Sequence, residues 1–172
     1  APESFQGAVV AGLLGVGDRY AGTAGECGEI LERIVARPQS ERSAAALEEV
    51  RDYRKQRRPL PGFGHPIHSQ LDRRVDKLLA VVEAQNTSGE FVAAMRLLER
   101  SLQKEVKKNL VTNISAAIGA ALAEASIPSA MMRGIVLTAR CAGLVGLLYE
   151  EMQHPAAHAR WVGAQDSVEY SE

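Results

Sequence analysis

Hydrophobic residues recur along this chain at intervals of three and four, the period of an α-helix with one buried face. Leu47, Val50 and Tyr53 form one such stripe, and Phe91 and Met95 begin another. No segment alternates convincingly between hydrophobic and polar residues, which is the pattern of a half-buried strand. The periodicity therefore predicts an all-α fold. Helices are expected over residues 4–17, 26–36, 43–57, 71–85, 115–125 and 129–153. A further helix is expected to begin at residue 90 and to end among Lys104, Lys107 and Lys108.

Glycine, proline and capping signals set the expected boundaries of these helices. Between Gly17 and Gly28 the chain is expected to form a loop, with turns at Gly22 and Gly25. Three further features are expected: a capping box of Thr87 and Glu90, a short β-rich connection over 109–114, and an extended polar tail from Trp161.

The segment from Ser129 to Gln153 is a long, apolar and glycine-bearing element. Its most hydrophobic part, Ile135 to Tyr149, is interrupted by Arg140 and is short for a bilayer span, so it predicts a buried helix of a soluble protein. No other apolar run is expected to be long enough to cross a membrane. The helix carries more hydrophobic surface than the chain can cover alone, which predicts a homo-oligomer. Close helix contact is expected at Gly134, Gly143 and Gly146.

Composition narrows the class of partner. The chain has 172 residues, of which 46% are hydrophobic, enough for one good core or a pair of small domains. The net charge of −1 argues against nucleic acid as a partner. Cys27 and Cys141 are isolated, without zinc-binding spacing, and are expected to be reduced thiols of a cytoplasmic protein. No metal and no membrane partner are expected, and no signal peptide is expected before Ala1.

One stretch interrupts the helical pattern and carries candidate chemistry. It runs Pro61-Gly62-Phe63-Gly64-His65-Pro66-Ile67-His68 and is followed by Asp72, Arg73 and Arg74. Two glycines and two prolines exclude a regular helix here and predict a rigid turn. The imidazole of His65 can exchange a proton near neutral pH, and a guanidinium such as that of Arg74 can hold a carboxylate by two parallel hydrogen bonds. The pattern indicates a site for a small acidic substrate.

Simpler interpretations stand beside this one. A glycine- and proline-rich stretch with one histidine is most often only a turn. His65 and His68 resemble half of a zinc site, but no third ligand lies at a supporting spacing. A basic cluster precedes the loop and either complements a helix C-terminus or forms a phosphate-binding rim for a nucleotide-like ligand such as coenzyme A. Its members are Arg51, Arg54, Lys55, Arg57 and Arg58.

The motif from Pro61 to His65, followed by Asp72-x-Arg74, resembles the signature loop of the citrate synthase family. Its Gly-His-Pro-Ile-His form is most similar to the citryl-CoA lyase-like branch. The resemblance implies a large and a small helical domain, a substrate bound between them, and a homodimer. It places the small domain at residues 22–112 and parts of the large domain at residues 1–21 and 113–172. It covers nearly the whole chain, yet the chain corresponds to only part of a usual member, without much of the N-terminal large domain.

The resemblance also implies roles for individual residues. His65 matches the second of two family histidines, while Tyr20 stands where the first is expected. Ser115, in Asn113-Ile114-Ser115, stands where the family has an aspartate. The carboxylate-binding arginines are expected at Arg74 and Arg140, with Arg160 as a weaker match. Residues expected at the coenzyme A site are Pro61, Gly62, Phe63, Gly64, Arg58, Lys108 and Asn113.

These departures bear on the expected reaction. Making a carbon nucleophile from acetyl-CoA needs a base, and a serine hydroxyl is a poor one. Condensation of the citrate synthase type is therefore disfavoured, although it stays open. Cleavage of citryl-CoA to acetyl-CoA and oxaloacetate is the expected activity, with His65 deprotonating the hydroxyl. Two non-enzymatic roles also stay open: a regulatory or accessory family member that binds coenzyme A or a dicarboxylate with little catalysis, and a helical interaction module.

Overall fold

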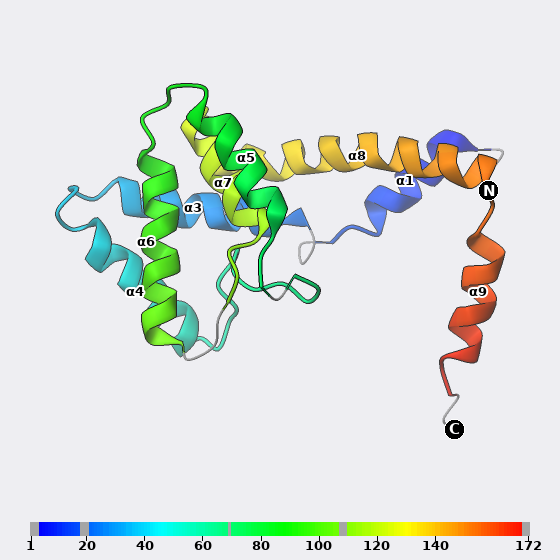
Figure 1. The fold of residues 1–172 in the computed structure, drawn as a ribbon, viewed down its shortest axis with the longest axis horizontal. Coiled ribbons are helices and arrows are strands. Elements are labelled where there is room, and N and C mark those ends of the chain that lie inside the picture. Colours follow the sequence, from blue (N-terminus) through cyan, green and yellow to red (C-terminus); the bar gives the residue numbers. More distant parts are fainter. Residues whose placement is uncertain (1–3, 18–20, 69, 107–109, 170–172) are drawn as a thin grey trace. The chain divides into compact units, whose positions relative to one another are not determined.

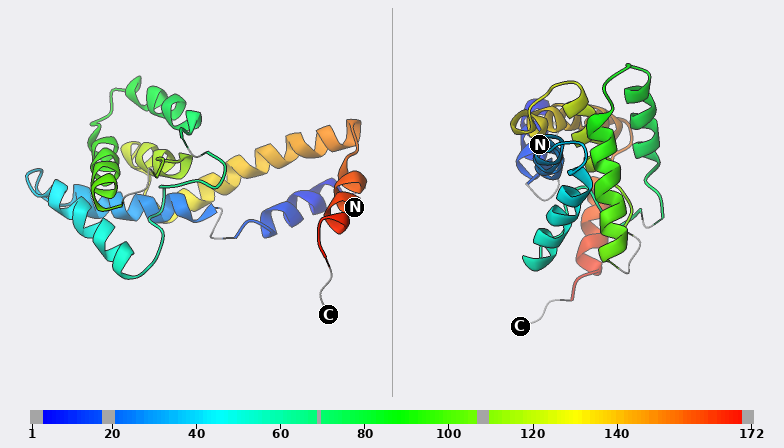
Figure 2. Two further views of the ribbon diagram at one scale, coloured as in Figure 1. Left: turned by 60° about the horizontal axis from the view of Figure 1, so that its bottom comes forward. Right: turned by 90° about the vertical axis from the view of Figure 1, so that its left-hand side faces the viewer.

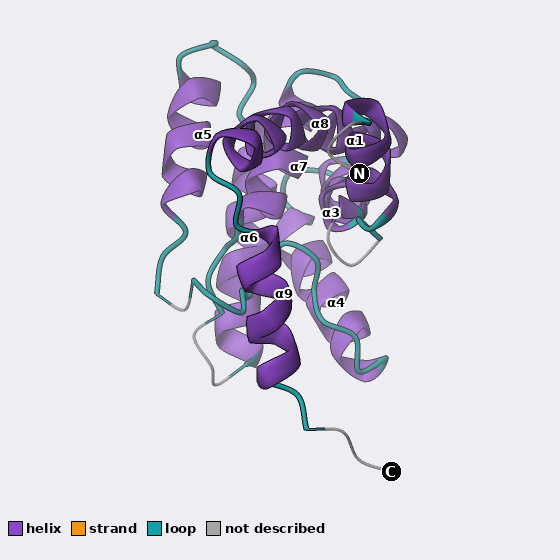
Figure 3. Cartoon of the chain, turned by 90° about the vertical axis from the view of Figure 1, so that its right-hand side faces the viewer, coloured by secondary structure: helices purple, strands orange, loops and turns teal. Residues whose placement is uncertain are grey.

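The computed structural model describes residues 4–17, 21–68, 70–106 and 110–169. These residues form helices joined by loops and contain no strand, which confirms the predicted all-α class (Figure 3). One isolated antiparallel bridge pairs Phe63 with Thr112. The helices, labelled in Figure 1, are α1 (Phe5–Leu14), α3 (Thr23–Val35), α4 (Arg42–Lys55), α5 (Arg73–Glu83), α6 (Glu90–Glu105), α7 (Ile114–Glu124), α8 (Ser129–Gln153) and α9 (Ala157–Asp166).

The chain divides into two compact units. Unit 1 combines residues 1–16 with residues 137–172, and unit 2 comprises residues 17–136. The first and last parts of the chain thus share one unit. The division differs from the expected boundary at residue 112, because α7 packs against α3, α5 and α6 within unit 2. The assignment of residues 22–112 to a small domain stays a prediction.

Unit 2 contains a hydrophobic core built by α3, α4, α5, α6 and α7, with Leu60 and Phe63 from the segment between α4 and α5. Within it, α3 packs mainly on α7 and α4 mainly on α6 (Figures 1 and 2). Ile30, Leu31 and Ile34 on α3 are fully buried, as are Met95 and Leu98 on α6. The apolar stripes predicted for α4 and α6 face inward, with Val50 and Met95 fully buried, and this part of the prediction is confirmed.

The expected loop before α3 is wrong in its second half. The helix begins at Thr23, so Gly25 and Gly28 lie inside it and are buried. Their lack of side chains serves helix packing: a Cβ on Gly28 would lie 2.4 Å from the Met132 sulfur. A Cβ on Gly119 of α7 would likewise lie 3.0 Å from the carbonyl oxygen of Ala24. Glycines that resemble turn signals in the sequence are here the contact points of tightly crossing helices.

The expected capping box at the start of α6 is also wrong. The N-cap residue is Gly89, with φ of 72°, and no side chain of the capping residue closes the helix. The carboxylate of Glu124, from α7, instead accepts hydrogen bonds from the backbone N–H groups of Gly89 and Phe91 at 3.0 and 2.8 Å. A carboxylate from another helix, and not the side chains of Thr87 and Glu90, therefore satisfies the free N–H groups at the N-terminus of α6.

Unit 1 consists of α1, most of α8, and α9. The tail predicted to be extended from Trp161 instead belongs to α9, a helix over Ala157–Asp166. The Glu151 carboxylate accepts hydrogen bonds from the backbone N–H groups of Ala156 and Ala157, both at 2.8 Å, and so satisfies the start of α9. Among the described residues, neither α1 nor α9 contains a buried residue.

The prediction that the long apolar helix is buried is wrong for this chain. Of the residues in α8 only Met132 is buried, and Leu147 and Tyr149 are 55% and 64% exposed. In the described part of the chain α8 is also the one helix whose length and composition would suffice to cross a membrane, a test that core helices of soluble proteins also pass. A Cβ added at Gly143 or Gly146 would meet no atom within 4 Å, so the helix contact expected at these glycines is absent within the described chain.

Candidate functional site

The signature loop, residues 61–68, is pinned to the segment that precedes α7. Phe63 pairs with Thr112, and the Gly64 N–H donates to the Val111 carbonyl oxygen at 2.7 Å. On the other side of the bridge, the Asn113 N–H donates to the Gly62 carbonyl oxygen at 2.9 Å. The loop and the start of α7, about fifty residues apart in sequence, therefore form one structural unit.

Both glycines of the loop are required by its backbone. Gly62 and Gly64 have φ of 86° and 82°, in the left-handed region that residues with a side chain rarely adopt. A Cβ on Gly62 would also lie 2.7 Å from the Ala116 Cβ and 3.0 Å from the Ala116 nitrogen. The loop can lie directly on the first turn of α7 only because Gly62 has no side chain.

Asn113 connects the loop to α7 through both ends of its amide. Its oxygen accepts a hydrogen bond from the Ser115 N–H at 2.9 Å and thereby caps α7. Its nitrogen donates to the Gly64 carbonyl oxygen at 2.7 Å. The residue predicted to contact coenzyme A thus holds the loop and helix together.

His65 is half-buried in the loop and has a defined hydrogen-bonding state. Its Nδ1 accepts hydrogen bonds from the backbone N–H groups of Ile67 and His68, at 3.0 and 3.1 Å. The neutral ring therefore carries its proton on Nε2, which makes no hydrogen bond to the described residues. Partial burial lowers the pKa of His65 below its ordinary value of 6.5, and the cationic forms of His68 and Arg74 act in the same direction.

Asp72 and Arg74 form the ionic part of the site. The Asp72 carboxylate is fully buried and accepts hydrogen bonds from Arg74 Nε and Nη2, both at 2.8 Å. It also accepts hydrogen bonds from the backbone N–H groups of Arg74 and Ile114, at 3.2 and 3.0 Å. The Arg74 side chain remains 51% exposed. The hydrogen bond from the Arg74 side chain is the main reason that the pKa of Asp72 falls to about 2.

Ser115, which the sequence motif predicts at the position of the family aspartate, has a hydroxyl partner. Thr23 Oγ1, at the start of α3, donates to Ser115 Oγ at 2.9 Å. This contact joins α3 to the first turn of α7, next to Asn113. No histidine or carboxylate activates the serine through a hydrogen bond among the described residues.

The other predicted site residues lie outside this arrangement. Arg140 and Arg160 belong to unit 1, where both are exposed, and their part in the site stays a prediction. Tyr20 and Lys108 lie outside the described residues. The Arg58 guanidinium lies 5.1 Å from the centre of the Tyr53 ring, in cation–π geometry on the surface of α4 and the turn that follows it.

The basic cluster before the loop is partly neutralised. Arg51 and Arg54 on α4 both pair with Glu105 at the end of α6, at 2.9 and 2.6 Å. This pairing ties α4 to α6 and leaves fewer charges for a phosphate than the sequence suggests. Ion pairing across two helices is not visible in the local sequence pattern, which explains the overestimate.

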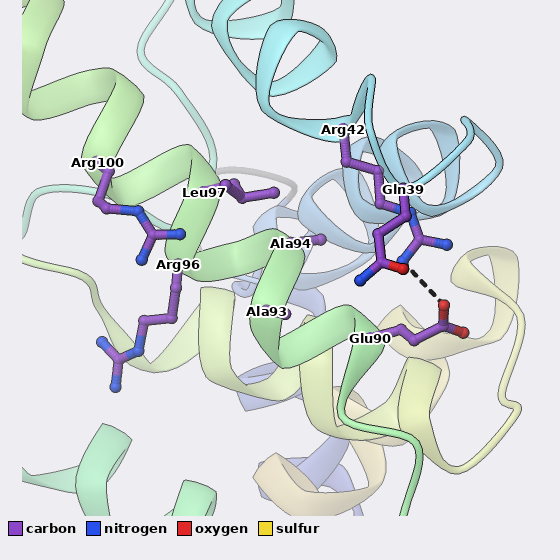
Figure 4. A pocket seen from close by; sticks show the side chains of 8 residues that line it. All are labelled: Gln39, Arg42, Glu90, Ala93, Ala94, Arg96, Leu97 and Arg100. Carbon is purple, nitrogen blue, oxygen red and sulfur yellow. Dashed lines mark ion pairs between the residues drawn. The ribbon is translucent and has the colours of Figure 1, made fainter.

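A separate groove of about 440 Å³ lies along α6 (Figure 4). Ala93, Ala94 and Leu97 form its apolar floor, with Arg96 and Arg100 at one end. At the other end Arg42 is already paired with Glu90 at 2.8 Å. None of the predicted site residues lines the groove, and its guanidinium groups do not converge on one point (Figure 4).

Two contacts at the site are invisible in the sequence. The glycine pattern places Thr23 in a loop, and nothing in its neighbourhood signals a bond to Ser115, 92 positions away. Asp72 belongs to the loop motif, but the motif does not reveal its bond to Ile114. A signal for its capping role does exist, since an aspartate directly before a helical stripe is a common N-cap.

This chain is similar to known proteins in both sequence and structure. The family described as citrate synthase, C-terminal domain, matches residues 4–161. No curated protein sequence matches the chain. Citryl-CoA lyase from Hydrogenobacter thermophilus has a similar structure, with a TM-score of 0.80 and 23% sequence identity, over 98% of this chain and 64% of the lyase chain.

Two further structures are similar at lower scores. ATP citrate lyase from Methanothrix soehngenii, in complex with citrate and coenzyme A, has a TM-score of 0.66 and 22% identity, over 96% of this chain and 30% of its own. Citrate synthase from Thermotoga maritima has a TM-score of 0.64 and 21% identity, over 88% of this chain and 44% of its own. The chain thus spans less than two thirds of each of these proteins, and at these identities the structural similarity establishes the fold. Since the family match covers most of the sequence, the chain belongs to the citrate synthase family.

Proposed function

We propose that the chain is part of an enzyme that cleaves citryl-CoA to acetyl-CoA and oxaloacetate. The observation that carries the proposal is the joining of His65, the Asp72–Arg74 pair and the N-terminus of α7 within unit 2. This arrangement combines one acid/base group with one carboxylate-binding group whose charge acts on it, which suits a hydroxy acid substrate. Similarity to citryl-CoA lyase over nearly the whole chain supports the same reaction class.

In this proposal Arg74 binds a carboxylate of the citryl group and His65 acts on its hydroxyl. Cleavage removes the hydroxyl proton, converts the C–O bond to a carbonyl, and breaks the adjacent C–C bond. The bonding electrons pass to the acetyl-CoA enolate, which then takes a proton. Because Nε2 of the resting His65 is protonated, the loop must release Nδ1 before Nε2 can accept the hydroxyl proton. In the reverse direction the resting Nε2–H is already placed to donate to a carbonyl oxygen.

The coenzyme A part of the substrate is assigned to the backbone of the signature loop. Gly64, which is not buried, allows a ligand to approach the main chain closely, and Arg58 supplies an exposed cation that precedes the loop. Lys108 and Asn113 are proposed to complete this part of the site. Arg140 and Arg160, together with a second copy of the chain, are proposed to supply the remaining carboxylate contacts. No metal is proposed.

The proposal is tested by incubating the chain with citryl-CoA and following the release of acetyl-CoA and oxaloacetate. We expect turnover, and we expect His65→Ala to reduce it by about 10²- to 10⁴-fold, the usual contribution of a positioned acid/base group. Asn86→Ala, on the surface turn after α5, serves as the control that leaves turnover unchanged. An unimpaired His65→Ala enzyme would contradict the assignment.

A second candidate function is ligand binding without efficient catalysis, as in a regulatory or accessory subunit. It is favoured by Ser115, whose hydroxyl partner Thr23 offers no basic group for proton transfer at carbon. Calorimetry with coenzyme A and citrate should then give binding without product. For such a subunit, Ser115→Asp combined with Tyr20→His should produce measurable turnover, whereas turnover by the unaltered chain would exclude this second function.

A further inference from the structure

Asp72 makes contacts that the proposed reaction does not by itself require. Its carboxylate is fully buried, yet every one of its hydrogen bonds goes to a group at the candidate site. A buried carboxylate without partners is strongly disfavoured, and this one is fully satisfied by Arg74 and Ile114. The arrangement fixes the position of the Arg74 guanidinium and therefore determines which of its N–H groups a ligand can reach.

The guanidinium of Arg74 has two edges that can form paired hydrogen bonds. Asp72 occupies the edge formed by Nε and Nη2, with both distances at 2.8 Å. The edge formed by Nη1 and the second proton of Nη2 carries no hydrogen bond within the described residues, and the side chain is 51% exposed. A ligand carboxylate can therefore bind the free edge in the same planar, paired geometry.

The same carboxylate also determines where α7 begins relative to Arg74. It accepts the N–H of Ile114 at 3.0 Å, between Asn113 and Ser115. Asn113 in turn holds the Gly64 carbonyl oxygen, one residue before His65. Through Asp72, the free edge of Arg74 is therefore kept in a set position relative to both the loop and Ser115.

We infer that Asp72 is a positioning residue that presents the free edge of Arg74 to a substrate carboxylate and holds it in register with the N-terminus of α7. This inference rests on the proposed function and adds the device that orients its carboxylate-binding group. It predicts that Asp72 affects citrate binding only through Arg74.

The test is a double-mutant cycle measured by calorimetric titration of the full chain with citrate. Asp72→Asn keeps the shape of the side chain but removes the charge that anchors Arg74. We expect it to weaken citrate binding by about tenfold or more, the equivalent of one charge-assisted hydrogen bond. Arg74→Gln should weaken it at least as much. In the double variant, Asp72→Asn should add almost nothing to the effect of Arg74→Gln.

Glu124→Gln is the matched control, because Glu124 is another carboxylate that satisfies a helix N-terminus but has no contact with Arg74 or the loop. It should lower stability and leave citrate binding unchanged. Equal citrate affinity in wild type and Asp72→Asn, or additive effects in the double variant, would overturn the inference. If Asp72→Asn does not fold, Arg74→Lys decides: it keeps the charge but not the paired edges, and unchanged affinity would overturn the inference.

Failure of the proposed function has a different signature. If the unaltered chain binds neither citrate nor coenzyme A, the proposed function is wrong and the inference is overturned with it. If the unaltered chain binds citrate and the cycle is additive, only the positioning role of Asp72 is wrong.

Discussion

At the scale of single residues, one buried carboxylate organises the candidate site. Asp72 caps the N-terminus of α5 and accepts hydrogen bonds from the Arg74 side chain. It also accepts a hydrogen bond from the backbone N–H of Ile114, the first residue of α7. These contacts favour its ionised form, so its pKa falls from 3.8 to about 2. A shift of this kind makes the stability of the protein depend on pH.

The first prediction concerns this pH dependence. Because the folded pKa of Asp72 is lower than the unfolded value, its contribution is complete above about pH 4 and is lost as the pH falls toward 2. Urea unfolding at pH 7 should give an Asp72→Asn variant that is less stable by about 2 kcal/mol, corresponding to this shift. At pH 3 the difference between wild type and variant should be about half as large. A difference that stays the same at both pH values would contradict the assignment.

The second prediction concerns His65. Its pKa lies below 6.5, lowered first by burial and then by the neighbouring cations, whereas the Asp72 carboxylate raises it. His68→Gln removes one cation and should raise the pKa of His65, while Asp72→Asn should lower it further. Titration of the imidazole Cε1 proton by NMR measures both values. Shifts of the same sign in the two variants would contradict this electrostatic account.

At the scale of helices, the close contact between α3 and α7 depends on glycine. A Cβ on Gly119 would lie 3.0 Å from the Ala24 carbonyl oxygen and 3.2 Å from the Gly28 nitrogen. Both neighbours are backbone atoms of buried residues inside α3 and cannot move aside easily. The contact matters for the site because Thr23 begins α3 and Ser115 lies in the first turn of α7.

The third prediction follows from this packing. Gly119→Ala should destabilise unit 2 by about 1–3 kcal/mol, because overpacking outweighs the gain in helix propensity. Gly143→Ala is the control, since a Cβ there would meet no atom within 4 Å, and it should be neutral or stabilising by up to about 1 kcal/mol in a monomer. Thermal or urea unfolding of the two variants measures the difference. A Gly119→Ala variant as stable as wild type would show that the helices can separate freely.

Helices whose boundaries and buried faces depend on local residue spacing agree with the sequence-based predictions. The apolar stripes of α4 and α6 follow from the helical period, and so does the prediction of α8, whose bounds match the expected 129–153. These predictions fail where a distant residue decides the outcome. The Glu124 carboxylate, and no local capping box, accepts hydrogen bonds from the N-terminal N–H groups of α6. Gly25 and Gly28 lie inside α3 against Ser129 and Met132 and do not form turns.

At the scale of the whole molecule, the two units differ in how they are stabilised. Unit 2 has a continuous buried core, whereas the described residues of unit 1 contain none. Exposed large hydrophobic side chains on unit 1 include Val145, Leu147 and Trp161. An exposed apolar surface of this kind is typical of a protein–protein interface, and we propose that a second copy of the chain buries it.

The fourth prediction tests this proposed interface between two copies of the chain. Leu147→Glu places a charge on the exposed apolar surface of α8 and should convert a homo-oligomer to a monomer. Light scattering after size-exclusion chromatography measures the mass. Val81→Glu is the control, because Val81 is similarly exposed, at 59% against 55%, but lies on α5 in unit 2. A wild-type chain that is monomeric at micromolar concentration, or a Val81→Glu variant that also dissociates, would contradict the proposed interface.

The helical class, the inward-facing stripes of unit 2 and the rigid loop with its imidazole and guanidinium groups follow from the amino-acid sequence alone. These features depend on residue type and local spacing, which decide directly whether a helix or a turn forms. The contacts of Asp72 with Ile114 and of Thr23 with Ser115, and the exposure of most of α8, became known only from the three-dimensional fold. Those outcomes depend on which distant segments meet, and the cost or gain of each contact exists only once the chain has packed.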